Sequence, residues 1–110
     1  METNRQLQNL LGIARRAGKL DLGTEAVKQS VRRRRAKLVL LSADLSQRAA
    51  GAACSEAEHA GVRAAPLPFG MDAVEAALGK RAGVIAVNDE GFARALQRLL
   101  SAPDRGGTNL

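Results

Sequence analysis

Apolar residues follow two different periods along this chain, and segments with the two periods alternate. In residues 3–17, Leu7, Leu11 and Ala14 stand three or four positions apart, which is typical of the buried face of a helix. Residues 37–41 are instead a nearly continuous apolar run, the pattern of a strand that is buried on both faces. The chain therefore mixes amphipathic helices with buried strands.

The same periods divide the whole chain into five helices and four strands. The predicted helices cover residues 3–17, 24–34, 46–60, 71–79 and 90–100. The predicted strands cover residues 19–22, 37–41, 62–67 and 83–87. Because strands and helices alternate, we expect an α/β fold, a three-layer α/β/α sandwich with a small four-stranded mixed sheet. Residues 1–100 are expected to form one domain, and residues 101–110 a disordered tail.

Short polar residues near the helix starts predict the N-caps. The candidates are Thr3 or Asn4 for the first helix, Asp44 or Ser46 for the third, and Asn88 or Asp89 for the last. Asp89 and Glu90 are adjacent carboxylates, but their place at a helix start favours a cap and a first-turn acid over a catalytic pair.

The charge of the chain is positive and unevenly placed. The net charge is +6 and the sequence pI is about 10.7. Residues 1–37 carry ten Lys/Arg and three Asp/Glu, a net charge of +7, whereas residues 38–110 carry a net charge of −1. A surplus confined to one third of the chain predicts a polyanionic partner, and its clustering favours nucleic acid over a merely solubilising surface.

Aromatic residues are nearly absent, which narrows the kind of nucleic acid. The chain has two Phe, no Trp and no Tyr. A platform that stacks bases on aromatic rings is therefore unavailable. Recognition must rely on shape, backbone and base edges, so a folded RNA is a better partner than a single strand.

Residues typical of catalysis, metal binding or membrane insertion are scarce. There is one cysteine, Cys54, which we interpret as a packed thiol, and one histidine, His59, which we place at the surface near a helix end. One Cys and one His cannot form a Cys/His zinc site or a disulfide framework, and no phosphate-cradling glycine motif follows a strand. We expect no enzyme activity, no cofactor, no metal and no membrane insertion. The expected protein is a soluble, cytoplasmic monomer.

The stretch from Asp21 to Lys37, DLGTEAVKQSVRRRRAK, concentrates the candidate RNA-binding chemistry. Gly23 and Thr24 open a helix, and a helix start offers unpaired backbone N–H groups and partial positive charge. Lys28 and the four-arginine run follow within a few turns. Together with the basic residues close to the preceding strand, these side chains are expected to form one positively charged face of the protein.

In its order of motifs, this chain resembles a known family. LLGIARRAGKL, AKLVLLSAD and VNDEGFA are the specific parts, and together they are similar to the ribosomal protein L7Ae/L30e family, particularly to its small bacterial members. The resemblance implies an α/β/α sandwich that binds kink-turn RNA, a sharply bent duplex with tandem sheared G·A pairs. It also implies a ribosome- or translation-associated role, with ribosomal RNA as one possible target.

The resemblance implies two RNA-contacting segments. In the family, a helix starting G-T-N-E-x-x-K reads guanine edges, and a loop before the last strand packs on the bulged nucleotides. Gly23 and Thr24 match this motif, whereas Glu25, Ala26 and Gln29 stand at the Asn, Glu and Lys positions, and Lys28 comes one place early. Glu25 can still accept hydrogen bonds from guanine N1–H and its amino group. The second segment corresponds to residues 80–84.

The expected RNA-binding residues come from both segments and the basic surface. They are Gly23, Thr24, Glu25, Lys28, Gln29, Arg32, Arg33, Arg16, Lys19, Lys37, Lys80, Arg81, Ala82 and Gly83. Two alternatives stay open at this point. One is a small basic protein-interaction module without specific RNA recognition, and the other is an enzyme for a phosphate-bearing small molecule at Gly23 or Gly79.

Overall fold

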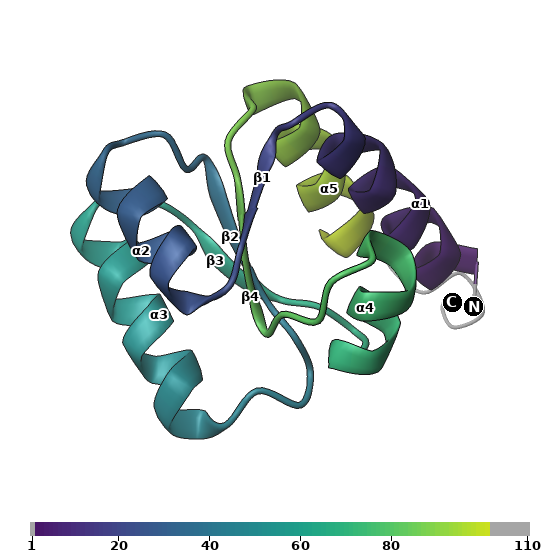
Figure 1. Cartoon of the computed structure of the whole chain (residues 1–110). Helices are drawn as coiled ribbons and strands as arrows, with labels where there is room; N and C mark the ends of the chain where they lie inside the picture. Colours follow the sequence, from purple (N-terminus) through teal and green to yellow (C-terminus); the bar gives the residue numbers. More distant parts are fainter. Residues whose placement is uncertain (1, 102–110) are drawn as a thin grey trace, which may run out of the picture.

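Four short apolar segments pair into one mixed sheet between two layers of helices, as Figure 1 shows. The computed structural model describes residues 2–101. The strands are β1 (Leu20–Leu22), β2 (Leu38–Leu41), β3 (Ala64–Pro66) and β4 (Val84–Val87). The helices are α1 (Glu2–Arg16), α2 (Thr24–Arg32), α3 (Gln47–His59), α4 (Met71–Leu78) and α5 (Glu90–Ser101). The predicted three-layer α/β/α sandwich is confirmed.

The strand order in the sheet is β1-β4-β2-β3. Strand β4 is antiparallel to both β1 and β2, and β2 is parallel to β3. Consequently β1, β2 and β3 start at one end of the sheet, and β4 starts at the other. This direction decides which loops meet: the turn after β1 lies beside the loop that leads into β4.

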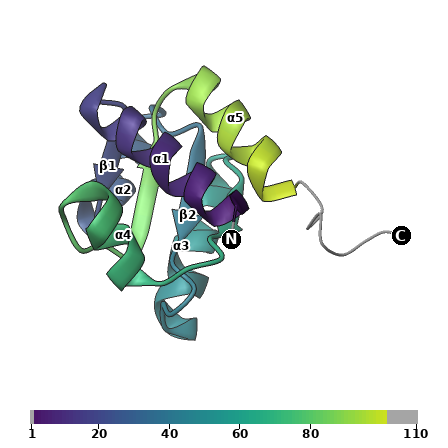
Figure 2. The same ribbon diagram turned by 90° about the vertical axis from the view of Figure 1, so that its right-hand side faces the viewer.

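Each face of the sheet has its own apolar core. Helices α1, α4 and α5 cover one face, and Figure 2 shows them together on the side toward the viewer. Helices α2 and α3 cover the other face. Along β2, Leu38 and Leu40 face the first core while Val39 and Leu41 face the second, because side chains alternate along a strand. All four residues of β2 are buried, as the continuous apolar run predicted.

Two predicted elements, the second helix and the third strand, were too long, and both errors have the same cause. Helix α2 ends at Arg32, because the Arg35 amide bonds the Ser30 carbonyl and Arg34 takes a left-handed conformation with φ 62°. Strand β3 starts at Ala64, because the Val62 amide bonds the Ala57 carbonyl at 2.8 Å and belongs to the turn that closes α3. In both places, hydrogen bonds of a helix end use residues that the apolar pattern assigned to the neighbouring element.

The cap predictions had mixed outcomes. Ser46 accepts the Ala49 amide at 3.1 Å, and Asp89 accepts the Phe92 amide at 2.9 Å, so both are confirmed. Asp44 instead accepts the amide of Met71, the first residue of α4, at 3.0 Å. Thr3 and Asn4 lie inside α1, so their prediction as caps was wrong. The predicted tail lies outside the described residues except for Ser101, which ends α5.

Candidate nucleic-acid interface

The turn between β1 and α2 depends on a glycine. Gly23 has φ 101° and ψ 156°, a conformation that is essentially restricted to glycine. Its amide donates a hydrogen bond to the Val84 carbonyl at 2.9 Å, which extends the pairing of β1 with β4 by one residue. A Cβ built on Gly23 would meet no atom within 4 Å. Any residue with a side chain would be strained here by the backbone angles and not by crowding, because the outer side of the turn is open.

The first turn of α2 has free backbone donors at this open turn. The Val27 amide bonds the Gly23 carbonyl at 2.9 Å, and no side chain of the described residues caps the helix. The preceding amides of the first turn therefore keep their hydrogen-bonding capacity, next to the positive end of the helix dipole. Thr24 and Glu25 are exposed beside them. Helices α3 and α5, in contrast, are capped by Ser46 and Asp89.

The loop of residues 79–83 lies next to this helix start, because it leads directly into Val84. Gly79 closes α4 in a left-handed conformation with φ 80°. The carbonyl of Gly83 accepts the Ser42 amide at 2.9 Å, and a Cβ on Gly83 would come within 2.7 Å of the Leu45 side chain. We call the combined surface of residues 23–26 and 79–83 the α2 corner.

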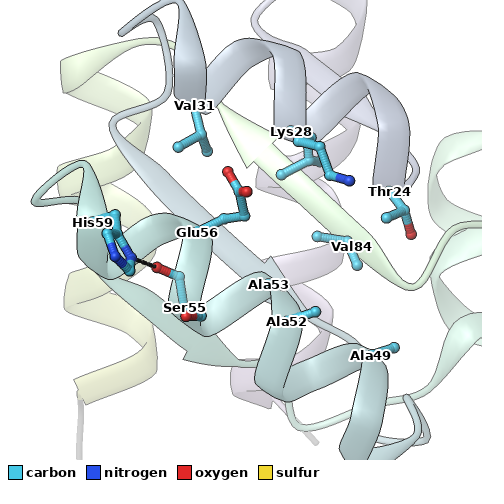
Figure 3. Close-up of a pocket in the computed structure, with 11 residues that line it drawn as sticks. Thr24, Lys28, Val31, Ala49, Ala52, Ala53, Ser55, Glu56, His59 and Val84 are labelled. Atoms are coloured by element: carbon cyan, nitrogen blue, oxygen red, sulfur yellow. Dashed lines mark hydrogen bonds between the residues drawn. The ribbon is translucent and has the colours of Figure 1, made fainter.

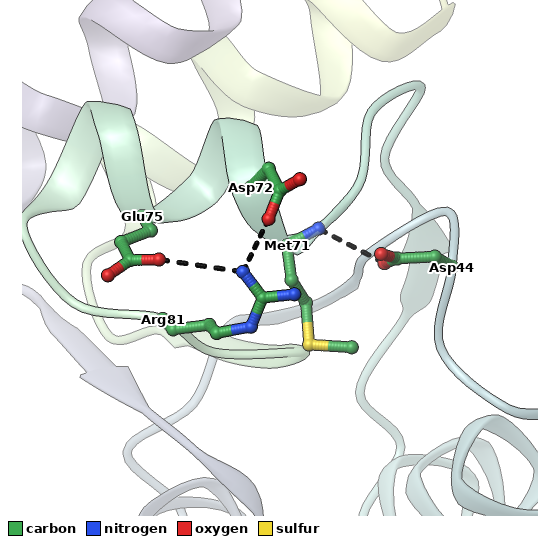
Figure 4. A network of polar contacts seen from close by, with 5 residues as sticks. All are labelled: Asp44, Met71, Asp72, Glu75 and Arg81. Atoms are coloured by element: carbon green, nitrogen blue, oxygen red, sulfur yellow. Dashed lines mark hydrogen bonds and ion pairs between the residues drawn. The ribbon is translucent and has the colours of Figure 1, made fainter.

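The predicted contact residues of this loop differ in their exposure. Lys80 is exposed, whereas Ala82 is only 5% exposed and belongs to the core. Arg81 is held within the chain: its Nη1 lies 2.5 Å from Asp72 Oδ1 and 3.5 Å from Glu75 Oε1, as Figure 4 shows. The hydrogen bond and charge of Asp72, followed by those of Glu75, raise the pKa of Arg81 above its ordinary value. An anion at this loop would have to compete with two carboxylates for Arg81.

Asp44 links the same region to the N-terminus of α4 (Figure 4). Desolvation raises the pKa of its carboxyl, but hydrogen bonds, including the one from the Met71 amide, and the Arg81 charge outweigh this effect. The pKa of Asp44 is therefore below its ordinary value, and the carboxylate stays ionised at neutral pH. With Glu25, Asp72 and Glu75 nearby in the same part of the fold, the α2 corner is not strongly basic.

The basic residues are divided between the two ends of α2. Glu25 and Gln29 lie one turn apart on its exposed side, with Lys28 beside them near the α2 corner. Helix α2 separates Gly23 from Arg33 by ten residues, or roughly 15 Å at about 1.5 Å per residue. The four-arginine run therefore lies at the far end of the helix. The structure does not bring the run and the glycine turn together.

Several predicted cations also have partners or neighbours elsewhere. Arg32 pairs with Glu56 of α3 at 3.2 Å. Arg16 lies in a groove between α1 and α4, near Gly12 and on the opposite face of the sheet from α2. Lys19 and Lys37 are exposed and precede β1 and β2, so they lie at the same end of the sheet as Arg33.

A buried polar network at that end was missed by the sequence analysis. The fully buried Ser30 donates its hydroxyl to Asn88 Oδ1 at 2.6 Å, and Asn88 Nδ2 donates to Asp21 Oδ2 at 2.9 Å. The same Asp21 oxygen accepts from Arg35 at 3.1 Å. The signal was present in the sequence, because Ser30 falls on the apolar stripe of α2 between Val27 and Val31. The network ties α2 to β1 and to the end of β4.

A groove of about 440 Å³ runs between α2 and α3 (Figure 3). Alanines of α3 and valines of α2 and β4 provide its apolar lining, and the side chains of Lys28, Glu56 and His59 add polar groups. The His59 Nδ1 donates to the Ser55 carbonyl of its own helix at 2.9 Å. His59 is exposed at the last residue of α3, as predicted. Thr24 lines the same groove, so it adjoins the α2 corner.

Residues 2–101 contain neither a cluster of metal ligands nor a membrane-spanning helix. No three His, Cys, Asp or Glu side chains in this range gather as metal ligands would. Within the same range, every helix is too short or too polar to cross a membrane.

Comparison with known proteins identifies the family. The sequence pattern of the Ribosomal protein L7Ae/L30e/S12e/Gadd45 family matches residues 5–64, more than half of the chain. This chain belongs to that family. A relative from Bacillus subtilis (strain 168), RNA-binding protein YlxQ, is 38% identical over 96 aligned positions, and the alignment covers 83% of this chain and 91% of the relative. RNA-binding protein YlxQ of Enterococcus faecium is 32% identical over 100 residues, covering 90% and 96% of the two chains.

Solved structures agree with the fold of this L7Ae-family chain. A protein of unknown function from Bacillus halodurans C superposes with a TM-score of 0.83 at 29% identity, over 87% of this chain and 97% of the other. The 15.5kD RNA binding protein of Giardia lamblia superposes with a TM-score of 0.69 at 18% identity, over 91% of this chain and 86% of the other. At that identity the second similarity shows the fold alone.

Proposed function

We propose that this L7Ae-family protein binds structured RNA of the kink-turn type through the α2 corner, in a ribosome- or translation-associated role. The observation that carries the proposal is the bond from the Gly23 amide to the Val84 carbonyl, which sets an uncapped helix start beside the loop of residues 79–83. These are the two segments that the family resemblance implies as RNA contacts. Two relatives that are at least 32% identical are named RNA-binding proteins, which supports RNA as the ligand class.

The α2 corner offers both hydrogen-bond donors and hydrogen-bond acceptors. The open amides of the first turn donate to phosphate or base oxygens, with the helix dipole in their favour. The exposed Glu25 carboxylate accepts from guanine N1–H and from the guanine amino group, and Gln29 stands one turn further along the same side. Lys28 supplies a positive charge for the backbone of the same RNA.

The substitutions within the family motif change the balance of this interaction. Glu25 in place of Asn accepts but does not donate, and Gln29 in place of Lys forms hydrogen bonds without charge attraction. Ala26 stands where the family motif has Glu, so that acidic group is absent from this chain. Selectivity for sheared G·A pairs therefore depends mainly on Glu25, and we expect its loss to cost about 1–3 kcal/mol of discrimination.

The proposal is tested by equilibrium binding to two RNAs of equal length, a kink-turn duplex and a straight duplex, at two salt concentrations. We expect tighter binding to the kink-turn, and we expect the ratio of the two affinities to persist at the higher salt concentration. Phosphate contacts weaken with salt for both RNAs alike, whereas base-edge contacts do not. Equal affinities for the two RNAs would reject kink-turn recognition.

A charge-matched pair of variants locates the contact. Glu25→Ala removes one negative charge at the α2 corner, and Glu58→Ala removes one from the exposed surface of α3. Glu25→Ala should lower the affinity ratio about tenfold, while Glu58→Ala leaves it unchanged. Lys28→Ala, which removes a positive charge beside the α2 corner, should weaken the binding of both RNAs by a similar factor. If Glu25→Ala keeps the affinity ratio of the parent protein, Glu25 is not the residue that recognises the guanine edge.

A further inference from the structure

Three strands start at the end of the sheet opposite the α2 corner, and an exposed cation precedes each of them. Lys19 precedes β1, Lys37 precedes β2 and Arg63 precedes β3. The fourth strand, β4, ends there, and the following Asn88 belongs to the buried network. We call the surface formed by Lys19, Lys37 and Arg63 the strand-start edge.

The backbone of the strand-start edge is fixed by the sheet. The Lys37 amide bonds the Val87 carbonyl at 2.7 Å, the Asn88 amide bonds the Lys19 carbonyl at 2.8 Å, and the Val39 amide bonds the Arg63 carbonyl at 2.9 Å. Leu20 and Leu38 both pair with Val87, so Lys19 and Lys37 stand at one level, two strands apart. Neighbouring strands are about 4.8 Å apart, so the three cations start from a row about 15 Å wide.

The end of α2 adds two further cations to the strand-start edge. Arg33 and Arg34 are exposed and form no ion pair with any of residues 2–101. Their backbone is held by the turn that bonds the Ser30 and Val31 carbonyls. Arg34 and Lys37 line one hollow of about 350 Å³. A rigid backbone with exposed guanidinium groups is suited to binding phosphates, because guanidinium matches phosphate oxygens in a bidentate manner.

Three acids near this end have partners within the fold. Asp21 is bound by Arg35, and Asp89 accepts the Phe92 amide at the start of α5. Glu90, which lines the hollow with Arg34 and Lys37, lies 3.6 Å from Arg94. The cations of the strand-start edge therefore remain available to bind an external partner. The α2 corner differs, because Glu25, Asp44, Asp72 and Glu75 offset its cations.

We propose that the strand-start edge is a second RNA-binding surface, which takes the phosphate backbone of a double-helical RNA segment while the α2 corner holds the first. This inference rests on the proposed function for the identity of the first ligand. The two surfaces lie at opposite ends of the strands, so each can hold its own RNA segment. The protein then joins two RNA segments, one chosen by base edges and one by charge alone.

An RNA helix fits the strand-start edge better than an acidic protein does. Protein interfaces usually bury apolar or aromatic anchors at their centre. In the described part of the chain, the large hydrophobic side chain that stands out as exposed is Ile13, which lines the groove between α1 and α4. The strand-start edge offers cations without such an anchor, as a sequence-independent backbone contact requires.

The test uses the full chain and two charge-matched triple variants. The first is Lys19→Gln/Lys37→Gln/Arg63→Gln, at the strand-start edge. The second is Arg5→Gln/Arg94→Gln/Arg98→Gln, which removes three charges from α1 and α5. An immobilised kink-turn RNA is loaded with protein, and capture of a labelled straight RNA duplex is measured. Binding of the straight duplex alone is measured across salt concentrations. Thermal melts verify that both variants are folded.

We expect the parent protein and the α1/α5 variant to capture the straight duplex, and the strand-start variant to lose capture at least about tenfold. Its salt slope for the straight duplex should fall by about two to three, and loading on the kink-turn RNA should stay within about twofold. The inference is overturned if both triple variants lose capture equally, or if the loaded parent protein captures no second duplex. It is also overturned if the strand-start variant loses binding to a polyglutamate peptide but not to RNA. Failure of the proposed function would instead appear as equal affinity for kink-turn and straight RNA, and the salt-slope comparison would still report on this edge.

Discussion

The amide nitrogen of Gly23 donates a hydrogen bond to the carbonyl oxygen of Val84 at 2.9 Å, and this bond joins two segments that are distant in the sequence. It makes the turn after β1 and the loop before β4 parts of one surface, the α2 corner. The direction of β4, antiparallel to β1, is what allows the two segments to meet.

Gly23→Ala tests the backbone of the α2 corner. With φ 101° and ψ 156°, the turn should cost any other residue about 1–3 kcal/mol of unfolding free energy, although no atom lies within 4 Å of the added Cβ. Gly51 is the control, because it lies inside α3, also with nothing within 4 Å of its Cβ. Gly51→Ala should gain about 0.5–1 kcal/mol. Urea unfolding measures both, and equal effects of the two variants would contradict the assigned turn.

Arg34→Gly tests the end of α2. Arg34 has φ 62°, which favours glycine, so this change should stabilise the protein by about 1 kcal/mol. Arg33→Gly removes the same charge at φ −87° and should bring no such gain. Thermal unfolding of the two variants under identical conditions gives the comparison. A loss of stability in Arg34→Gly would show that the turn ends differently.

Asn88→Ala tests the buried network. It leaves the fully buried Ser30 hydroxyl without its partner, and we expect a loss of about 1–3 kcal/mol. The double variant Ser30→Ala/Asn88→Ala should lose less than the sum of the single variants, because the unpaired hydroxyl is gone. Additive losses in a double-mutant cycle would mean that the two side chains do not interact.

The lowered pKa of Asp44 makes the stability of the fold depend on pH. Its pKa is lower in the folded chain than in the unfolded chain, so it stabilises the fold above its unfolded pKa. This contribution is lost as the pH falls from about 4 through the folded pKa. The melting temperature of Asp44→Ala should therefore lie below that of the parent at pH 7, with the difference shrinking toward pH 3. A difference that stays constant over this range would contradict the assigned role of the carboxylate.

Much of the fold follows from the sequence, because the buried elements have clear apolar periods. β2 is buried on both sides as its apolar run predicted, and Val27 and Val31 mark the buried face of α2. The position of the arginines did not follow, because closeness in sequence to Gly23 was taken as closeness in space. A helix of nine residues carries Arg33 away from its own start.

The contacts between distant side chains were harder to predict for a different reason. The Ser30–Asn88 hydrogen bond and the Asp44–Met71 cap join residues that only the strand order brings together. Arg81 was predicted as an RNA contact from its place in the loop, but its engagement by Asp72 and Glu75 depends on where α4 lies. Local pattern carries no information about such pairs.

The most direct test of the central claim is an NMR titration of the isotope-labelled protein with one equivalent of a kink-turn RNA. We expect the largest amide shift changes at Thr24, Glu25 and Ala26 and in the loop of residues 79–83, with smaller changes along α5. Largest changes on α5 or α1, with the first turn of α2 unmoved, would contradict the assignment of the α2 corner as the RNA-reading surface.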